Sequence, residues 1–211
     1  VNAVGDGLGV ECAGTIARVG PGVTQFAIGD RVLAMVPGSL SRFVCAPVAT
    51  TAALPPDLED AAAATIPITF LTAAYALESL AKIGSGDRVL IHAGTGGVGQ
   101  AAIQIAQRAG AQVFATASQG KWQILKDLGV KHIFDSRTTE FESAINQLTD
   151  GKGVDIVLNS LAGEFTDASL RLLKPGGRFL EIGIEPYMLA STLLGVLAQR
   201  LARCNCQHCL V

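Results

Sequence analysis

Residues 88–110 read RVLIHAGTGGVGQAAIQIAQRAG and carry the strongest indication of the fold. Its opening, residues 88–92, is short, apolar at its centre and followed at once by a glycine-rich turn, which predicts a buried strand. Over residues 98–109, apolar side chains recur at i, i+3, i+4, i+7, i+8 and i+11, the pattern of an amphipathic helix. A strand, a tight turn and a helix in this order form the first half of a βαβ unit.

The same unit repeats along the chain. Four more β-branched or apolar runs begin 24, 20, 22 and 24 residues after one another, at residues 112–116, 132–134, 154–158 and 178–182. Helical patterns cover 141–148 and 165–172, Gly110 and Gly129 stand where helix C-caps are expected, and residues 174–177 (KPGG) predict a stop and a turn. Residues 81–183 therefore predict an α/β domain, a doubly wound parallel sheet of the Rossmann type.

The N-terminal part has a different pattern. Residues 10–19, 31–36 and 42–46 are strand-like and separated by Gly/Pro turns, which predicts a partial all-β barrel. Residues 58–80 are Ala-rich and predict two bridging helices broken at Pro67, so the first domain is expected over residues 1–80. Residues 184–211 fit neither pattern and form an atypical tail, whose closing Cys/His cluster we do not expect to bind zinc.

Composition excludes several classes of protein. The 211 residues carry a net charge of −2, with 49% hydrophobic and 16% charged residues, so no basic patch favours nucleic acid or a membrane surface. No apolar run reaches the roughly 20 residues that a spanning helix needs. The five cysteines form no disulfide framework, which favours a reducing cytoplasm. A start at Val1 instead of Met suggests a piece of a longer protein.

The glycine-rich turn predicts a bound dinucleotide. Gly94, Gly96 and Gly99 satisfy G-x-G-x-x-G directly between a strand and a helix. These glycines allow a tight turn, close approach of the backbone to a pyrophosphate, and close packing of the helix on the strand. The N-terminus of the helix would then bind the phosphates through its free N–H groups and its dipole.

The end of the second strand indicates which cofactor binds. An NAD site usually has Asp or Glu there, about 20 residues beyond the loop, to bind the ribose 2′-hydroxyl. Here residues 116–121 read TASQGK, and the next acid along the chain is Asp127. The hydroxyl of Ser118 and the ammonium of Lys121 suit a 2′-phosphate, so the pattern favours NADPH.

Other chemistry has little support. His92 lies in an apolar strand and is interpreted as a core or loop-bracing histidine, and His132 has no neighbour at metal-ligand spacing. No G-x-S-x-G nucleophile motif occurs, so the sequence does not indicate a hydrolase.

Several motifs resemble known families. Residues 9–14, 19–20 and 29–32 resemble the GroES-like barrel of medium-chain dehydrogenases/reductases. Residues 91–102, 120–122, 135–137 and above all 151–161 (GKGVDIVLNSL) resemble the enoyl reductase domain of type I polyketide synthases, and fatty acid synthases carry a similar domain. Zinc-dependent relatives have Gly-His-Glu where this chain has Val10 before Glu11, so the chain is more similar to the zinc-free branch.

This resemblance implies NADPH-dependent reduction of an α,β-unsaturated acyl thioester on an acyl carrier protein. It also implies that the domain works beside the other domains of a megasynthase, and that the parent protein forms a homodimer. It assigns the pyrophosphate to residues 96–98, the 2′-phosphate to Ser118, Lys121 and Arg137, and the nicotinamide half to Thr72, Asn159 and Leu161. With the rest of the glycine-rich loop, the candidate cofactor-binding residues are Thr72, Gly94, Thr95, Gly96, Gly97, Val98, Gly99, Ser118, Lys121, Arg137, Asn159 and Leu161.

The chain departs from the resemblance at the residues expected to move a proton. Ile184 stands where the family usually has a Lys that is a proposed proton donor, and no Tyr-bearing segment of the family pattern precedes Gly9. Catalytic residues are therefore left unassigned, and the chain is interpreted as truncated at both ends. Two alternatives stay open: a free-standing zinc-free quinone oxidoreductase, which the NSL segment at 159–161 disfavours, and an inactive NADP-binding remnant.

Overall fold

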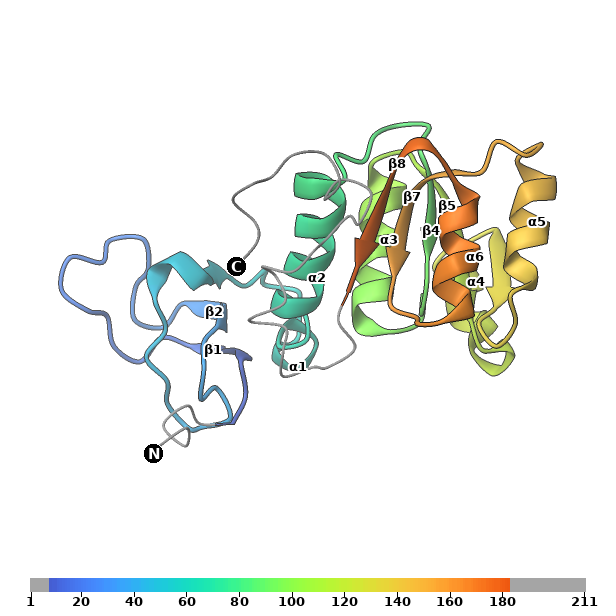
Figure 1. Cartoon of the computed structure of the whole chain (residues 1–211). Coiled ribbons are helices and arrows are strands. Elements are labelled where there is room, and N and C mark those ends of the chain that lie inside the picture. The colour runs from blue at the N-terminus through green and yellow to red at the C-terminus, as the bar shows by residue number, and fades with distance from the viewer. Residues whose placement is uncertain (1–7, 183–211) are drawn as a thin grey trace, which may run out of the picture. The chain divides into compact units, whose positions relative to one another are not determined.

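The computed structural model describes residues 8–182, which divide into two compact units between Leu71 and Thr72 (Figure 1). The first unit holds an antiparallel sheet of order β1-β2-β3, with β1 at Glu11–Thr15, β2 at Arg31–Met35 and β3 at Thr51–Ala53. Within the described residues, the antiparallel sheet is consistent with part of a GroES-like barrel. The Ile184 substitution and the predicted tail lie outside the described residues.

The third strand was predicted wrongly. Residues 42–46 make no ladder with another described strand, and Thr51–Ala53 pairs with β2 instead. The Ser41 hydroxyl donates to the carbonyls of Gly38 and Phe43, which turns the chain, and Phe43 is 71% exposed. An apolar run alone does not make a strand where no neighbouring strand accepts its backbone hydrogen bonds.

The bridging helices are confirmed, with the break at Pro67. Helix α1 covers Asp60–Ala63 and α2 covers Pro67–Ala74, and a π-helical segment, Tyr75–Leu80, then follows directly. Proline suits the first turn of a helix because its missing N–H would have no partner there. The boundary between the units lies inside α2. Beyond it, Ala73, Ala76 and Leu77 are buried, and the π-helical segment contacts the helix Gly97–Arg108 of the second unit.

The second unit confirms the doubly wound parallel sheet. Its strands stand in the order β6-β5-β4-β7-β8, and every neighbouring pair is parallel. The strands are β4 Arg88–Ile91, β5 Gln112–Ala117, β6 His132–Asp135, β7 Val154–Asn159 and β8 Leu173–Glu181. The helices are α3 Gly97–Arg108, α4 Trp122–Asp127, α5 Glu140–Leu148 and α6 Glu164–Leu172.

Helices cover both faces of this sheet, which explains why its strands are apolar on both sides (Figure 1). On one face, Leu90 and Phe114 form a buried core with Phe141 of α5 and Leu172 of α6. On the other face, side chains of α3 and α4 approach Ala115 of β5 around the glycine-rich loop. Each strand thus alternates its side chains between two cores.

The helix stop and turn predicted at residues 174–177 are confirmed, because α6 ends at Leu172 and these four residues make no pair with β7. β8 runs through this turn as an irregularity, since Leu173 pairs with Val154 and the next pair is Arg178 with Ile156. Gly176 absorbs the distortion at φ +77°, a conformation that glycine adopts without steric cost.

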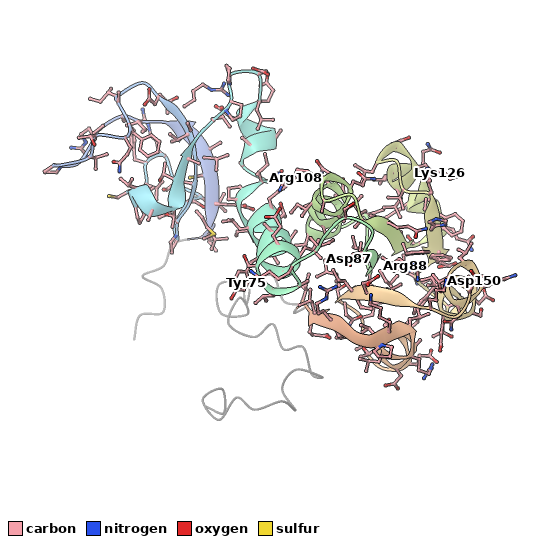
Figure 2. The ribbon with its side chains drawn as sticks, turned by 90° about the horizontal axis from the view of Figure 1, so that it is seen from above. Tyr75, Asp87, Arg88, Arg108, Lys126 and Asp150 are labelled. Atoms are coloured by element: carbon pink, nitrogen blue, oxygen red, sulfur yellow. The ribbon has the colours of Figure 1, made fainter. Side chains whose placement is uncertain are left out.

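A network of charged side chains ties together the amino ends of the strands. Asp87 and Arg88 lie at the start of β4 (Figure 2), where the Arg88 N–H donates to the Asp155 carboxylate at 2.8 Å and Lys174 pairs with the same group. Burial of Asp155 penalises its charged form, but these hydrogen bonds hold the pKa of the carboxyl below its ordinary value. This network is far from the carboxyl ends of the strands, where ligands of such sheets bind.

Among residues 8–182, no helix combines the length and the apolar character that crossing a bilayer requires.

Candidate functional site

The glycine-rich loop lies at the point where the strand order reverses. It follows β4, whose two neighbours are β5 on one side and β7 on the other. The Gly94 N–H donates to the Thr116 carbonyl at 2.9 Å, and the Gly96 N–H donates to the Ala93 carbonyl at 2.8 Å. In open α/β sheets, the crevice at this switch point is where ligands bind.

A Cβ would overlap the backbone at one glycine of the loop and be crowded at another. A Cβ at Gly99 would lie 2.4 Å from the Ala93 carbonyl oxygen, and one at Gly94 would lie 3.2 Å from side-chain carbons of Ala115 and Leu125. Ala93 itself has φ +49°, a strained value for a residue with a side chain. The loop is therefore pressed against α3 and the sheet, and its backbone forms the floor of the crevice.

Helix α3 begins on this loop and offers an anion site. Gly96 is its N-cap and provides no side chain to satisfy the first-turn N–H groups, which belong to Gly97, Val98 and Gly99. The Thr95 carbonyl is already occupied by the Gln100 side-chain amide at 3.0 Å, which fixes the loop. Free N–H groups and the dipole of a 12-residue helix fit a pyrophosphate.

The candidate residues for the 2′-phosphate lie at the carboxyl ends of β5 and β6. Ser118 follows β5 directly, Lys121 ends the next 3₁₀ turn, and Arg137 comes two residues after β6. The pairing of Ala117 with Asp135 places these two strand ends side by side. Within residues 8–182, neither Lys121 nor Arg137 forms an ion pair, so both cations are free for an anionic ligand.

One acidic residue near this group was missed. Asp135 accepts a hydrogen bond from the Gln119 side-chain amide at 2.8 Å and another from the Arg137 N–H at 2.9 Å. The sequence analysis looked for an acidic residue shortly after β5. Asp135 instead ends β6, the next strand along the chain, and lies beside the end of β5 only in the folded sheet. Both of its oxygens have partners, so it holds the Ser118–Lys121 loop and the Arg137 backbone in place.

On the other side of the crevice, Asn159 ends β7 and is fully buried. Its amide nitrogen donates to the Leu161 carbonyl at 2.7 Å and to the Glu181 carboxylate at 3.0 Å, and its oxygen accepts from the Leu161 N–H. The hydrogen bonds of the Asn159 side chain therefore fix the conformation of the loop that carries Leu161. Glu181, at the end of β8, is a positioning residue that the sequence did not single out.

Thr72 opens the second unit and is 7% exposed. Its hydroxyl has no hydrogen-bond partner within the part of the chain that the structure describes. Buried hydroxyls without partners are rare in folded proteins, so the role predicted for Thr72 at the nicotinamide half stays a prediction that this hydroxyl does not contradict.

His92, directly before the loop, is confirmed as a structural residue. Its Nε2 lies 2.7 Å from the Ser169 hydroxyl, and its Nδ1 lies 2.9 Å from the Thr116 hydroxyl. Ser169 donates its own hydrogen to the Phe165 carbonyl, so Nε2 carries the imidazole hydrogen and Thr116 donates to Nδ1. Burial lowers the pKa of His92 to about 4, which keeps the ring neutral and binds β4 to β5 and α6.

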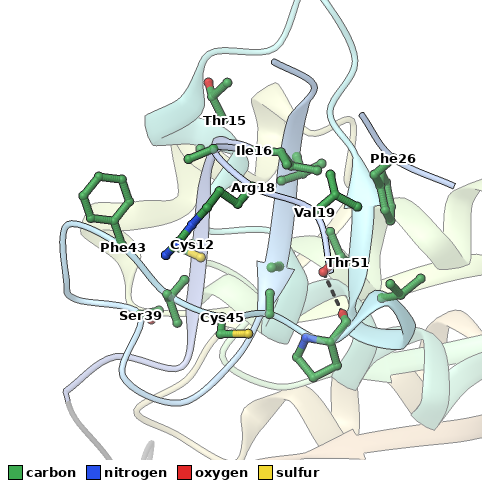
Figure 3. Close-up of a pocket in the computed structure, with 18 of the residues that line it drawn as sticks. Cys12, Thr15, Ile16, Arg18, Val19, Phe26, Ser39, Phe43, Cys45 and Thr51 are labelled. Atoms are coloured by element: carbon green, nitrogen blue, oxygen red, sulfur yellow. Dashed lines mark hydrogen bonds between the residues drawn. The ribbon is translucent and has the colours of Figure 1, made fainter. Parts of the chain in front are cut away.

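The first unit has no part of the predicted cofactor site. This unit has a hollow of about 870 Å³. Figure 3 shows side chains that line it, among them Cys12, Ile16, Phe26, Phe43 and Cys45. Burial raises the pKa of the Cys12 thiol, so this thiol is less reactive than an exposed one.

Glu11, which follows Val10 where zinc-dependent relatives have the Gly-His-Glu motif, has a structural partner. Its carboxylate accepts a hydrogen bond from the Ile68 N–H at 2.9 Å, in the first turn of α2. Across residues 8–182, no group of three or more His, Cys, Asp or Glu is arranged to hold a metal ion. The Cys/His cluster of the tail lies outside this range.

Comparison with known proteins supports the same interpretation. Residues 97–205 match the zinc-binding dehydrogenase family, and residues 3–56 match the alcohol dehydrogenase GroES-like domain. The pikromycin polyketide synthase component PikAII of Streptomyces venezuelae is 50% identical over 178 residues, which are 83% of this chain and 5% of that protein. The chain thus spans only a small part of the curated relatives it matches.

Solved structures agree. The CurK enoyl reductase is 45% identical with a TM-score of 0.80, over 93% of this chain and 67% of that one. A mycobacterial protein in complex with NADPH is 33% identical with a TM-score of 0.76, over 88% of this chain and 62% of that one. The chain therefore belongs to the zinc-binding dehydrogenase family and, within it, to the enoyl reductase domains of polyketide synthases.

Proposed function

We propose that this domain uses NADPH to reduce an α,β-unsaturated acyl thioester carried on an acyl carrier protein, during polyketide or fatty acid synthesis in the cytoplasm. The observation that carries the proposal is the crevice at the switch point. There, the N-terminus of α3 lies beside two strand ends that carry Lys121 and Arg137 without ion-pair partners in the described residues. The similarity to enoyl reductase domains supports the reaction type.

Different residues of the crevice would bind different parts of the cofactor. Gly97, Val98 and Gly99 would donate their N–H groups to the pyrophosphate, while Ser118 and Lys121 would bind the 2′-phosphate. Leu161 would contact the nicotinamide half, on a loop held by Asn159. NADPH supplies a hydride for the β-carbon of the substrate when bound.

The first experiment tests the choice of cofactor. Lys121→Ala should weaken NADPH binding by roughly ten- to a hundredfold, because a charged hydrogen bond contributes about 1.5–3 kcal/mol. NADH has no 2′-phosphate, so its affinity should hardly change. Titration calorimetry of both cofactors measures this, with Lys126→Ala as the control, an exposed lysine at the end of α4.

Equal losses for NADH and NADPH would mean that Lys121 supports the fold and does not recognise the phosphate. The effect should also shrink as the salt concentration rises, because exposed charges are screened. An effect of Lys126→Ala as large as that of Lys121→Ala would reduce the proposal to general electrostatic attraction.

The second experiment tests the reaction. NADPH oxidation with a crotonyl thioester is compared with oxidation by a quinone, on the same preparation. We expect reduction of the thioester at a low rate, because Ile184 replaces a family lysine and general acid assistance contributes about 10²–10⁴-fold. Activity with the quinone alone would favour the free-standing oxidoreductase, and NADPH binding with neither activity would favour the inactive remnant.

A further inference from the structure

Ser160 has a buried hydroxyl oxygen with no hydrogen-bond partner among the described residues. The other such atoms in the described part of the second unit are the Thr72 hydroxyl and Nε of Arg178. Arg178 donates through its terminal nitrogens to the Ala81 carbonyl and to Asp87, so its guanidinium is part of the network at the amino ends of the strands. Ser160 instead follows the last residue of β7, at the carboxyl end of the sheet.

The loop around Ser160 is held firmly on both sides. Asn159 binds Leu161 through both ends of its amide, and the Thr166 hydroxyl donates to the Leu161 carbonyl at 2.9 Å. The neighbouring polar side chains therefore have partners, while the Ser160 hydroxyl has none. A buried hydroxyl without a partner costs free energy, and such an exception calls for an explanation.

The path of a bound dinucleotide explains why this hydroxyl has no partner in the protein. Its pyrophosphate would lie on the N-terminus of α3, and its adenosine half would extend over β5 and β6 toward Lys121. The nicotinamide half must then lie on the other side of β4, over the end of β7 where Ser160 stands. Because Ser160 as a residue is only half-buried, rotation about its Cα–Cβ bond can turn the hydroxyl toward a ligand.

We propose that the Ser160 hydroxyl binds the carboxamide of the nicotinamide ring. This inference rests on the proposed function, since it takes NADPH as the ligand. The carboxamide has a carbonyl oxygen that accepts and an NH₂ group that donates, and a hydroxyl can pair with either. Ser160 is thus assigned to recognition of the ring, and Ser118 and Lys121 to recognition of the opposite end of the cofactor.

The test uses two ligands that differ only by the ring, NADPH and 2′-phospho-ADP-ribose. Calorimetry measures the affinity of the wild type, Ser160→Ala and Thr166→Val for both. Ser160→Ala should weaken NADPH roughly three- to tenfold, the effect of one neutral hydrogen bond, and leave 2′-phospho-ADP-ribose unchanged. Thr166→Val is the matched control, because it removes a hydroxyl in the first turn of α6 that already has a partner, the Leu161 carbonyl.

Thermal unfolding of the ligand-free variants gives a second readout. Ser160→Ala should unfold at the wild-type temperature or above, since it removes an unpaired hydroxyl, whereas Thr166→Val should unfold at a lower temperature. A marked loss of stability in Ser160→Ala would show an internal partner and overturn the assignment.

The remaining outcomes separate this inference from the function it rests on. Equal weakening of both ligands by Ser160→Ala, or no weakening, overturns the role of Ser160 and leaves the cofactor site intact. A wild type that binds neither ligand overturns the proposed cofactor and the role of Ser160 with it.

Discussion

Acidification should destabilise the second unit through His92. The ring is neutral in the folded state because burial lowers its pKa to about 4, whereas an unfolded histidine titrates near pH 6.5. Below pH 6.5 the unfolded chain therefore binds a proton that the folded protein does not accept. Stability conferred by this group is fully present above pH 6.5 and is lost as the pH falls toward 4.

The two pKa values set the size of the effect. Integrating the difference in proton binding predicts that the free energy of unfolding falls by about 2 kcal/mol between pH 7 and pH 5 from His92 alone. Carboxyl groups whose pKa is lowered, such as Asp155, act mainly at lower pH. The interval from pH 7 to pH 5 thus isolates the histidine.

Urea unfolding at pH 7 and pH 5, followed by the fluorescence of Trp122 in the second unit, measures this. His92→Gln should be less stable than the wild type at pH 7, because it loses the edge contact of the ring with Phe141 at 5.1 Å. Its stability should however change about 2 kcal/mol less between the two pH values. His132→Gln, which leaves His92 in place, is the control and should keep the wild-type change.

The reasoning is refuted if His92→Gln and the wild type lose the same free energy between pH 7 and pH 5. That result would mean that burial does not lower the pKa of His92 in the folded state.

Two further substitutions test the crevice. Gly99→Ala should reduce NADPH affinity at least about tenfold, because the new Cβ would press on the Ala93 carbonyl, while Gly84→Ala, on the amino side of β4, enters open space and should bind normally; equal affinities by calorimetry would contradict this. Asn159→Asp places a carboxylate against Glu181 in a buried site and should cost about 3 kcal/mol in urea unfolding. The double variant with Glu181→Gln should recover part of that loss. An Asn159→Asp variant with the wild-type free energy of unfolding would contradict this prediction.

The βα order and the position of the glycine-rich loop follow from local sequence patterns. Strand–helix periodicity is local, and the glycines act within the turn that contains them, so residues 88–110 were enough to predict both. The break of the bridging helices at Pro67 is local for the same reason. A similar sequence pattern over residues 42–46 predicted a strand wrongly, because a strand also needs a partner from elsewhere in the chain.

The residues that complete the crevice depend on how the strands pack, which the sequence pattern did not predict. Asp135 meets Gln119, and Glu181 meets Asn159, through the register of neighbouring parallel strands that are 16 and 22 residues apart in sequence. The unpaired hydroxyl of Ser160 is likewise visible only when every neighbour is in place. Parallel strands are joined through a helix, so the residue that arrives beside a given strand end depends on packing and register, which no local pattern encodes.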